Sequence, residues 1–449
     1  MNRSRETHGA AAPPAWLVGI AAGALFGLIS AFPFHPPFLE EAYGYVLVAG
    51  FLGSALVCGL SRFAMLGDVS SDALSLLLLV ALMCGMFGLP HLYRLVLFAA
   101  AGVLIGHLTM RIGWFFSVIQ RPEVCVAFAL LVHQALYLSS TLVVRFYGAY
   151  WQVPVLVAGL VGFAGIKTLG RCKGKTDTLS EPALAREGLV RQRRALIALG
   201  VVALLGSLAD STVYWGAATP GGFSTLTLTS QSLCYVFAGA ASAFWVYHSG
   251  HLGLATFSLS VLGLGFAVRL LGAQLPFAWS AGSYLLSIGL AGTDMFYWVS
   301  VCLLARQFGA RRTLGVALGV YVGCIIASSV FVNAGFGSGA GNAVADIVVI
   351  AALFLSIPYV LNHVGATHDT YTEIAEPAPK PVVSLFAKPL TPAENRVFDL
   401  LCLGKSDPEI ARSLTISRST VKFHVRNILR KAGVDSRKRL LAEIVHKNT

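Results

Sequence analysis

The stretch TISRSTVKFHVRNILRKAGV, from Thr415 to Val434, is polar, basic and regularly patterned, although it lies near the end of a mostly apolar chain. At about 100° per residue, the side chains of Val421, Val425 and Ile428 fall within about 60° of one another around a helix. The opposite side of that helix carries hydroxyl and basic side chains. The stretch therefore predicts an amphipathic helix with an apolar back and a basic front.

Two shorter helices are predicted just before this stretch. Thr391 and Glu394 have the spacing of a capping box, and Pro392 between them suits the first helical position. Ser406 or Asp407 then caps a second helix. A helix with a basic front, placed second in a helix-turn-helix pair, has the chemistry to enter the DNA major groove. There Arg and Lys bond guanine, and an apolar ring contacts the thymine methyl group.

Four segments of this tail occur in the order and spacing of a known domain: LTPAE, EIARSL, STVKFHVRNILRKAGV and SR. On these segments, Leu390 to Val445 resembles the LuxR-type, or GerE-like, helix-turn-helix domain of bacterial transcription regulators. The resemblance implies a four-helix domain that binds double-stranded DNA as a homodimer. A fourth helix over residues 437–446 would make the dimer contact, or would only close the core of its own domain.

The predicted DNA-contacting residues are the basic front of the helix and nearby groups that neutralise phosphates. The resemblance places the base-contacting positions at Lys422, Phe423 and Arg426. Phe423 departs from the Val that is commoner in the family, and Arg418 stands where a small or acidic residue is frequent. The DNA sequence that is read therefore stays open. The full predicted set is Arg418, Ser419, Thr420, Lys422, Phe423, Arg426, Arg430 and Lys431.

The rest of the chain has the composition of a bilayer protein. Of the 449 residues, 56% are hydrophobic and only 12% are charged, unlike a soluble globular protein. The net charge of +12 is uneven, because 14 of the 33 Lys and Arg residues follow Thr370. A bilayer crossing takes about 20 apolar residues. Twelve such runs begin near Ala15, Tyr43, Ala73, Leu95, Val124, Ala149, Ala195, Thr225, Leu252, Ala278, Thr313 and Ala343.

The loops predict how the chain lies in the membrane. When alternate loops are assigned to the two sides, only Arg94, Arg145 and Arg269 fall near one side. By the positive-inside rule the other side is cytoplasmic, and an even number of helices brings both termini there. We therefore expect a multi-pass protein of the inner membrane. Its predicted cytoplasmic basic residues are Arg3, Arg5, Arg62, Arg111, Arg121, Arg171, Lys173, Lys175, Arg186, Arg191, Arg193, Arg194, Arg306, Arg311 and Arg312.

The twelve runs divide six and six around a basic stretch, RCKGKTDTLSEPALAREGLVRQRR, predicted as the central cytoplasmic loop 171–194. This layout resembles the major facilitator superfamily. The loop signature of that family is poorly matched by GLSRFAMLGDVSSD and is missing from VYHSGHLG, which puts active transport in doubt. Glycines at four-residue spacing predict close approach of neighbouring helices. They are Gly19, Gly23 and Gly27, and again Gly315, Gly319 and Gly323.

Asp210 and Asp294 stand near the middle of predicted membrane helices. An Asp there costs about 2.5–3.5 kcal/mol on insertion scales and normally faces a cavity or a partner. Aromatic residues follow both, a combination that suits a small organic ligand with a polar or cationic part. The predicted ligand site comprises Asp210, Tyr214, Asp294 and Trp298. Two other interpretations stay open: the acids join helices to one another, and the aromatic residues anchor helix ends at the interface.

The fold class is therefore all-α, with a membrane bundle of about twelve helices and a small C-terminal domain. A short cytoplasmic N-terminus covers residues 1–14 and the bundle covers 15–362. The Pro-rich stretch EPAPKP lies in an extended linker over 363–388. The helix-turn-helix domain covers 389–449.

The favoured function is a membrane-anchored, one-component transcription regulator whose bundle senses an unknown small molecule and controls DNA binding by the tail. Two alternatives are an active transporter with a regulatory DNA-binding tail, and an inert anchor whose tail is released by proteolysis. The eight cysteines are scattered, without metal-ligand spacing. We expect no metal, no cofactor and no enzymatic activity, because no nucleophile and base or phosphate loop is evident.

Overall fold

The structure is a computed structural model. It describes residues 13–30, 49–53, 76, 80, 89–117, 119, 121–147, 152–171, 186–215, 225–331, 340–365, 390–402, 405–414, 417–437 and 439–440. Within these ranges every regular element is a helix. The chain separates into two compact units, Met1–His368 and Asp369–Thr449. The first unit is the membrane bundle and the second contains the basic tail.

The described part of the bundle contains long helices that match ten of the twelve predicted runs. The expected runs near Tyr43 and Ala73 fall mostly outside the described residues, so the count of twelve stays a prediction. In chain order the long helices are α1 (Ala15–Ser30), α4 (His91–Gly113), α5 (Pro122–Tyr147), α6 (Gln152–Arg171), α7 (Arg186–Trp215), α8 (Thr225–Ser249), α9 (His251–Leu270), α10 (Pro276–Phe308), α11 (Ala310–Phe331) and α12 (Ala340–Gly365).

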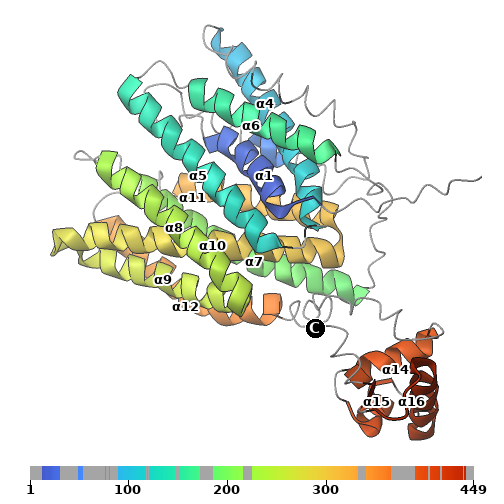
Figure 1. The fold of residues 1–449 in the computed structure, drawn as a ribbon. Helices are drawn as coiled ribbons and strands as arrows, with labels where there is room; N and C mark the ends of the chain where they lie inside the picture. The colour runs from blue at the N-terminus through green and yellow to red at the C-terminus, as the bar shows by residue number, and fades with distance from the viewer. Residues whose placement is uncertain are drawn as a thin grey trace, which may run out of the picture. The chain divides into compact units, whose positions relative to one another are not determined.

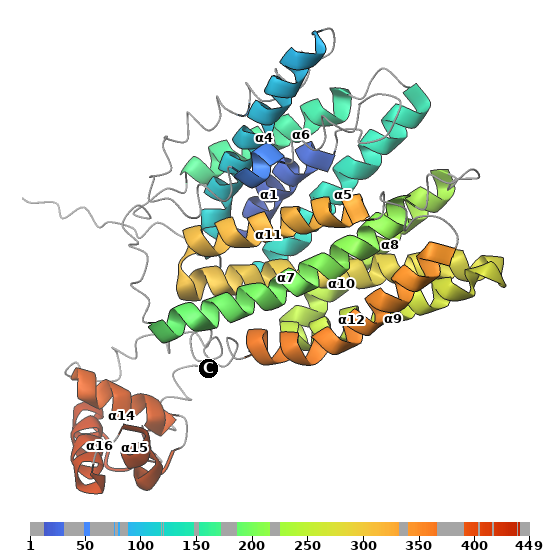
Figure 2. The same ribbon diagram turned by 180° about the vertical axis from the view of Figure 1, so that it is seen from behind.

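The bundle has two groups of helices that meet along its middle. In Figures 1 and 2, α1, α4, α5 and α6 lie together beside α7 to α12. Within the first group α1 packs on α4, α5 and α6, and within the second α10 packs on α7, α8, α9 and α11. Helix α5 also packs on α8 and α10, which joins the groups. Helices from both predicted halves therefore contribute to the centre of the bundle.

Glycine explains the close contact between α1 and α5. A Cβ atom at Gly19 would overlap the carbonyl oxygen of Cys125, and one at Gly23 would overlap the backbone of α5 in the same way. The close approach predicted for this stripe is confirmed. The second stripe is different at Gly323, where an added Cβ would meet no atom within 4 Å. The prediction of close packing is wrong at that position, where the described structure leaves open space.

Seven of the described helices contain a stretch long and apolar enough to cross a membrane, namely α4, α5, α7, α9, α10, α11 and α12. Two shorter apolar stretches lie in α1 and α6. Many large apolar side chains of the bundle are exposed, including Phe237 and Phe244 of α8 and Leu355 of α12. In a bundle that crosses a bilayer such side chains contact lipid.

The second unit has three described helices and a core of its own. They are α14 (Pro392–Cys402), α15 (Asp407–Leu414) and α16 (Arg418–Ala432), in the predicted order. Its buried core consists of Val397, Phe398, Leu401, Ile410, Ala411, Val421, Ile428 and Leu440. The fourth predicted helix, over 437–446, lies mostly outside the described residues. Leu440 at its start is fully buried in this core, so this part of the segment helps to close the domain.

Candidate functional site

The helix with the basic front, α16, has well-defined ends. The Ser417 side chain accepts a hydrogen bond from the Thr420 backbone N–H at 3.1 Å, which caps the N-terminus. Gly433 ends the helix with φ of 68°, a conformation that favours glycine. Val421 and Ile428 are fully buried, which confirms the predicted apolar back. The opposite face of α16 is therefore fixed in its orientation.

That opposite face is exposed to solvent as predicted. Ser419, Lys422, Arg426 and Arg430 are exposed, and the Phe423 side chain is 55% exposed. Phe423 does not belong to the described core of the domain. The arrangement can offer charge to phosphates, hydrogen bonds to base edges and one apolar ring to a thymine methyl group.

Several polar residues on or beside this face have partners within the domain. Thr420 is partly buried, and its Oγ1 lies 2.7 Å from the Ser417 Oγ atom. The Arg430 Nη2 atom donates to the Asn427 Oδ1 atom at 3.1 Å. Lys431 Nζ lies 2.6 Å from the Glu394 Oε2 atom, and the Lys431 side chain is only 18% exposed. Lys431 therefore connects two helices in this structure, whereas the prediction assigned it to DNA.

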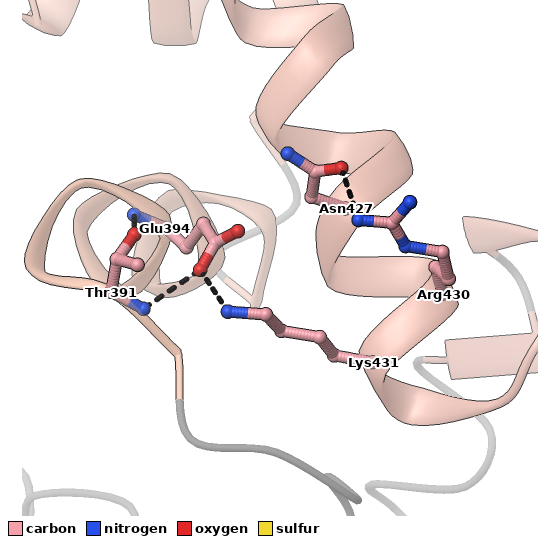
Figure 3. A network of polar contacts seen from close by, with 5 residues as sticks. All are labelled: Thr391, Glu394, Asn427, Arg430 and Lys431. Carbon is pink, nitrogen blue, oxygen red and sulfur yellow. Dashed lines mark hydrogen bonds and ion pairs between the residues drawn. The ribbon is translucent and has the colours of Figure 1, made fainter.

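Glu394 is the centre of this connection (Figure 3). Its carboxylate accepts from the Thr391 backbone N–H at 2.7 Å, and its own N–H donates to Thr391 Oγ1 at 3.3 Å. This confirms the predicted capping box. Burial alone would raise the pKa of Glu394, but the hydrogen bonds from Lys431 and Thr391 outweigh it and lower the pKa to about 2. The buried carboxylate holds the start of α14 against the end of α16.

The membrane unit contains the second candidate site, around Asp294 of α10. Asp294 is buried, and its two carboxylate oxygens accept hydrogen bonds from different helices. Tyr235 of α8 donates its hydroxyl to Oδ2 at 2.6 Å, and Tyr321 of α11 donates to Oδ1 at 3.1 Å. Phenol donors reduce the cost of a buried carboxylate without neutralising its charge.

The structure brings together most of the predicted ligand site. Asp210 of α7 interacts electrostatically with Asp294 and with Tyr321, so the two predicted acids share one region of the bundle. Trp298 lies one turn beyond Asp294, and its ring centroid is 5.2 Å from that of Tyr321. The side chain of Tyr214 lies outside the described residues. Three of the four predicted residues are therefore neighbours of Tyr321.

Sequence reasoning missed Tyr235, Tyr321 and Phe26, whose ring centroid is 5.4 Å from that of Trp298. The sequence has 14 tyrosines, and no local pattern separates these from the rest. It also missed Asp346, a third acid in a membrane helix. Asp346 Oδ1 lies 3.6 Å from Arg269 Nη2, and both side chains are buried. Among the described residues, no three His, Cys, Asp or Glu side chains form a group that could hold a metal ion.

Solved structures of transporters resemble the membrane unit in fold. The chain matches a bacterial homologue of the iron transporter ferroportin in its outward-facing state, with a TM-score of 0.58 and 11% identity over 78% of this chain and 98% of the other. It matches the major facilitator superfamily transporter FucP with a TM-score of 0.55 and 13% identity, covering 78% and 98% of the two chains. The human organic anion transporter TETRAN gives a TM-score of 0.55 and 15% identity, covering 78% and 100%. The membrane unit therefore has a major-facilitator-like fold.

The tail matches a family by sequence. Residues 388–443 match the bacterial regulatory proteins of the luxR family. The spore germination protein GerE of Bacillus subtilis (strain 168) is 42% identical over 60 residues, which cover 13% of this chain and 81% of that protein. The matched range contains α14, α15 and α16, with the exposed face of α16 described above. Through this DNA-binding domain the chain belongs to the luxR family of bacterial regulatory proteins.

Proposed function

We propose that this chain is a membrane-anchored, one-component transcription regulator. The observation that carries the proposal is the combination, in one chain, of a luxR-family DNA-binding domain and a major-facilitator-like bundle. The bundle senses a small molecule, and its state controls sequence-specific DNA binding by the tail. The protein lies in the inner membrane with both termini in the cytoplasm, and it binds DNA as a homodimer. The proposal assigns it no enzymatic reaction.

The exposed face of α16 supports the DNA-binding part of this proposal. Lys422, Phe423 and Arg426 contact base edges, and Arg418, Ser419 and Arg430 contact the phosphate backbone. We assign no direct contact to Lys431 or Thr420, because both are only partly exposed and the Lys431 ammonium group pairs with Glu394. The DNA-reading surface is then smaller than the sequence predicted.

Binding of promoter DNA by residues 384–449 tests this part. This segment contains the separate core of the second unit, so it can be studied alone. We expect it to bind DNA upstream of its own gene, with an affinity that falls steeply as salt rises. Arg426→Ala should cost about 1–3 kcal/mol at the preferred site and relax the choice of base at one position. Binding that ignores both salt and this substitution would contradict the proposal.

An active transporter with a regulatory tail is the second candidate. It is favoured only by the fold of the bundle, since the three solved structures above are described as transporters or a transporter homologue. At sequence identities of 11–15% these structures indicate a shared fold but do not indicate a shared activity. Uptake measurements in cells with and without the protein separate the two candidates. A third, release of the tail by proteolysis, would give a stable soluble fragment of about residues 384–449 on an immunoblot.

A further inference from the structure

Two carboxylates near the middle of the bundle have no basic partner in the described part of the chain. Within the described residues, neither Asp210 nor Asp294 forms an ion pair with a basic side chain, and the interaction between them is one of like charges. Asp346 gives the contrast, because it is paired with the buried Arg269. A carboxylate at membrane depth needs compensation. Around Asp294 the described protein supplies hydroxyl donors but no positive charge.

A group of aromatic rings lies next to Asp294 and is connected to it by the Tyr321 hydroxyl. The ring centroid of Tyr321 lies 5.1 Å from that of Tyr297 and 5.2 Å from that of Trp298. Phe26 of α1 extends the group, with its ring 5.4 Å from Trp298. Ring faces attract cations by an electrostatic interaction that strengthens when water is excluded. Aromatic walls next to acids favour a ligand that combines a positive charge with an apolar body.

An unsatisfied amide is the second, independent indication of a ligand. Gln231 of α8 is 3% exposed, and neither its Oε1 nor its Nε2 atom has a hydrogen-bond partner among the described residues. Gln231 lies one helical turn before Tyr235, so both project from the same side of α8, the side that faces Asp294. A buried amide without partners costs free energy. A polar group on a bound ligand would remove that cost.

We infer that these groups form a binding site for an organic cation, such as an amine or quaternary ammonium with an apolar body. The charge lies between Asp210 and Asp294, the apolar body lies against Tyr321 and Trp298, and Gln231 bonds a further polar group. Asp210 and Tyr321 are partly exposed whereas Asp294 is buried, so the cation meets Asp210 first. The inference rests on the proposed sensing function and gives the class of molecule that is sensed.

Matched probes test the charge requirement on the purified full chain in nanodiscs. Tetraphenylphosphonium and tetraphenylborate have the same shape and opposite charge. Choline and 3,3-dimethylbutan-1-ol form a smaller pair, one cationic and one neutral. We expect displaceable binding of at least one cation and none of its matched partner. The inference is overturned if neither cation binds displaceably, or if the anion or the alcohol binds as tightly as the cation.

Variants then place the bound cation. Asp294→Asn and Asp210→Asn should each weaken cation binding about tenfold or more, since each removes a charged partner. Tyr321→Phe, which keeps the ring and loses the donor to Asp294, should weaken it less. Tyr284→Phe is the control, because that hydroxyl bonds Ser230 at 2.6 Å and lies outside the aromatic group; it should bind as wild type.

Folding and cation binding are measured separately in these variants. Thermal unfolding of each purified variant checks that loss of binding is not loss of structure. If Asp294→Asn fails to fold, Asp210→Asn and Tyr321→Phe still test where the cation binds. Wild-type affinity in all of the folded variants overturns the placement. DNA binding by residues 384–449 is measured independently. If no cation binds, the cation site is refuted but the proposed regulatory function is not. If residues 384–449 do not bind DNA, the proposed regulatory function is refuted, whatever the bundle binds.

Discussion

The ion pair between Glu394 and Lys431 should stabilise the C-terminal domain. Glu394→Gln keeps the shape of the side chain and one acceptor oxygen, and it removes the charge. Lys431→Met keeps the apolar part of the lysine side chain and removes the ammonium group. The Lys431 Nζ atom lies 2.6 Å from the Glu394 Oε2 atom, and the pair joins α14 to α16. Each variant should therefore have a lower free energy of unfolding than wild type. The double variant should lose little more of this free energy than either single variant.

The pKa of Glu394 gives the size of the contribution that the ion pair makes to the free energy of unfolding. Its value of about 2 lies below the ordinary 4.5, and each unit corresponds to about 1.4 kcal/mol, so the upper limit is about 3.5 kcal/mol. Water near the partly exposed Lys431 screens the pair and reduces the contribution to about 1–2 kcal/mol. Because the folded pKa is depressed, this stability is present above about pH 4.5 and is lost as the pH falls toward 2.

Urea unfolding of residues 384–449, followed by circular dichroism, measures the effect. At pH 7 we expect a coupling free energy of about 1–2 kcal/mol in the double-mutant cycle. The stability difference between wild type and Glu394→Gln should shrink between pH 4.5 and pH 2. DNA affinity of Lys431→Met at a temperature where it is folded should equal that of wild type. No coupling, together with a weakened and less salt-dependent DNA complex, would show that Lys431 contacts phosphate instead.

Three further predictions concern single residues. If Phe423 contacts a thymine methyl group, replacing that thymine by deoxyuridine should weaken DNA binding of wild type by several-fold and leave Phe423→Ala unaffected; equal losses in both proteins would exclude the contact. Asp346→Asn should lower the thermal stability of the full chain in detergent, by about 3–5 kcal/mol, because it leaves Arg269 buried without its partner; an unchanged melting temperature would contradict a structural ion pair. Gly23→Leu should separate α1 from α5 and reduce the yield of folded protein, while the same change at Gly323, where space is open, should be tolerated.

Local sequence patterns predicted most of the C-terminal domain. The capping box of Thr391 and Glu394 and the buried positions Val421 and Ile428 depend on residues close in sequence. Partners distant in sequence were not predictable. The sequence near Glu394 does not indicate that its carboxylate forms an ion pair with Lys431 on another helix. The charge of Lys431 alone therefore favours the prediction that it binds DNA.

The membrane unit shows the same division. Apolar runs predict the helices because a bilayer requires continuous apolar surface, and the glycine spacing predicts that a neighbouring helix approaches α1 closely. The surroundings of Asp294 depend on how helices rotate against one another, which a single sequence does not encode locally. Only the folded bundle therefore shows that Tyr235 and Tyr321 donate hydrogen bonds to Asp294. For the same reason Asp346 was not recognised as a structural acid with Arg269 as its partner.

Occupancy of chromosomal DNA by the full-length protein tests the central claim most directly. Chromatin immunoprecipitation would compare wild type with Arg426→Ala, which alters the DNA-reading face, and with Asp294→Asn, which alters only the bundle. We predict discrete binding sites for wild type, loss of those sites in Arg426→Ala, and the same sites at changed occupancy in Asp294→Asn. Equal occupancy in all three proteins, or no enriched sites in wild type, would contradict a membrane bundle that controls DNA binding through its tail.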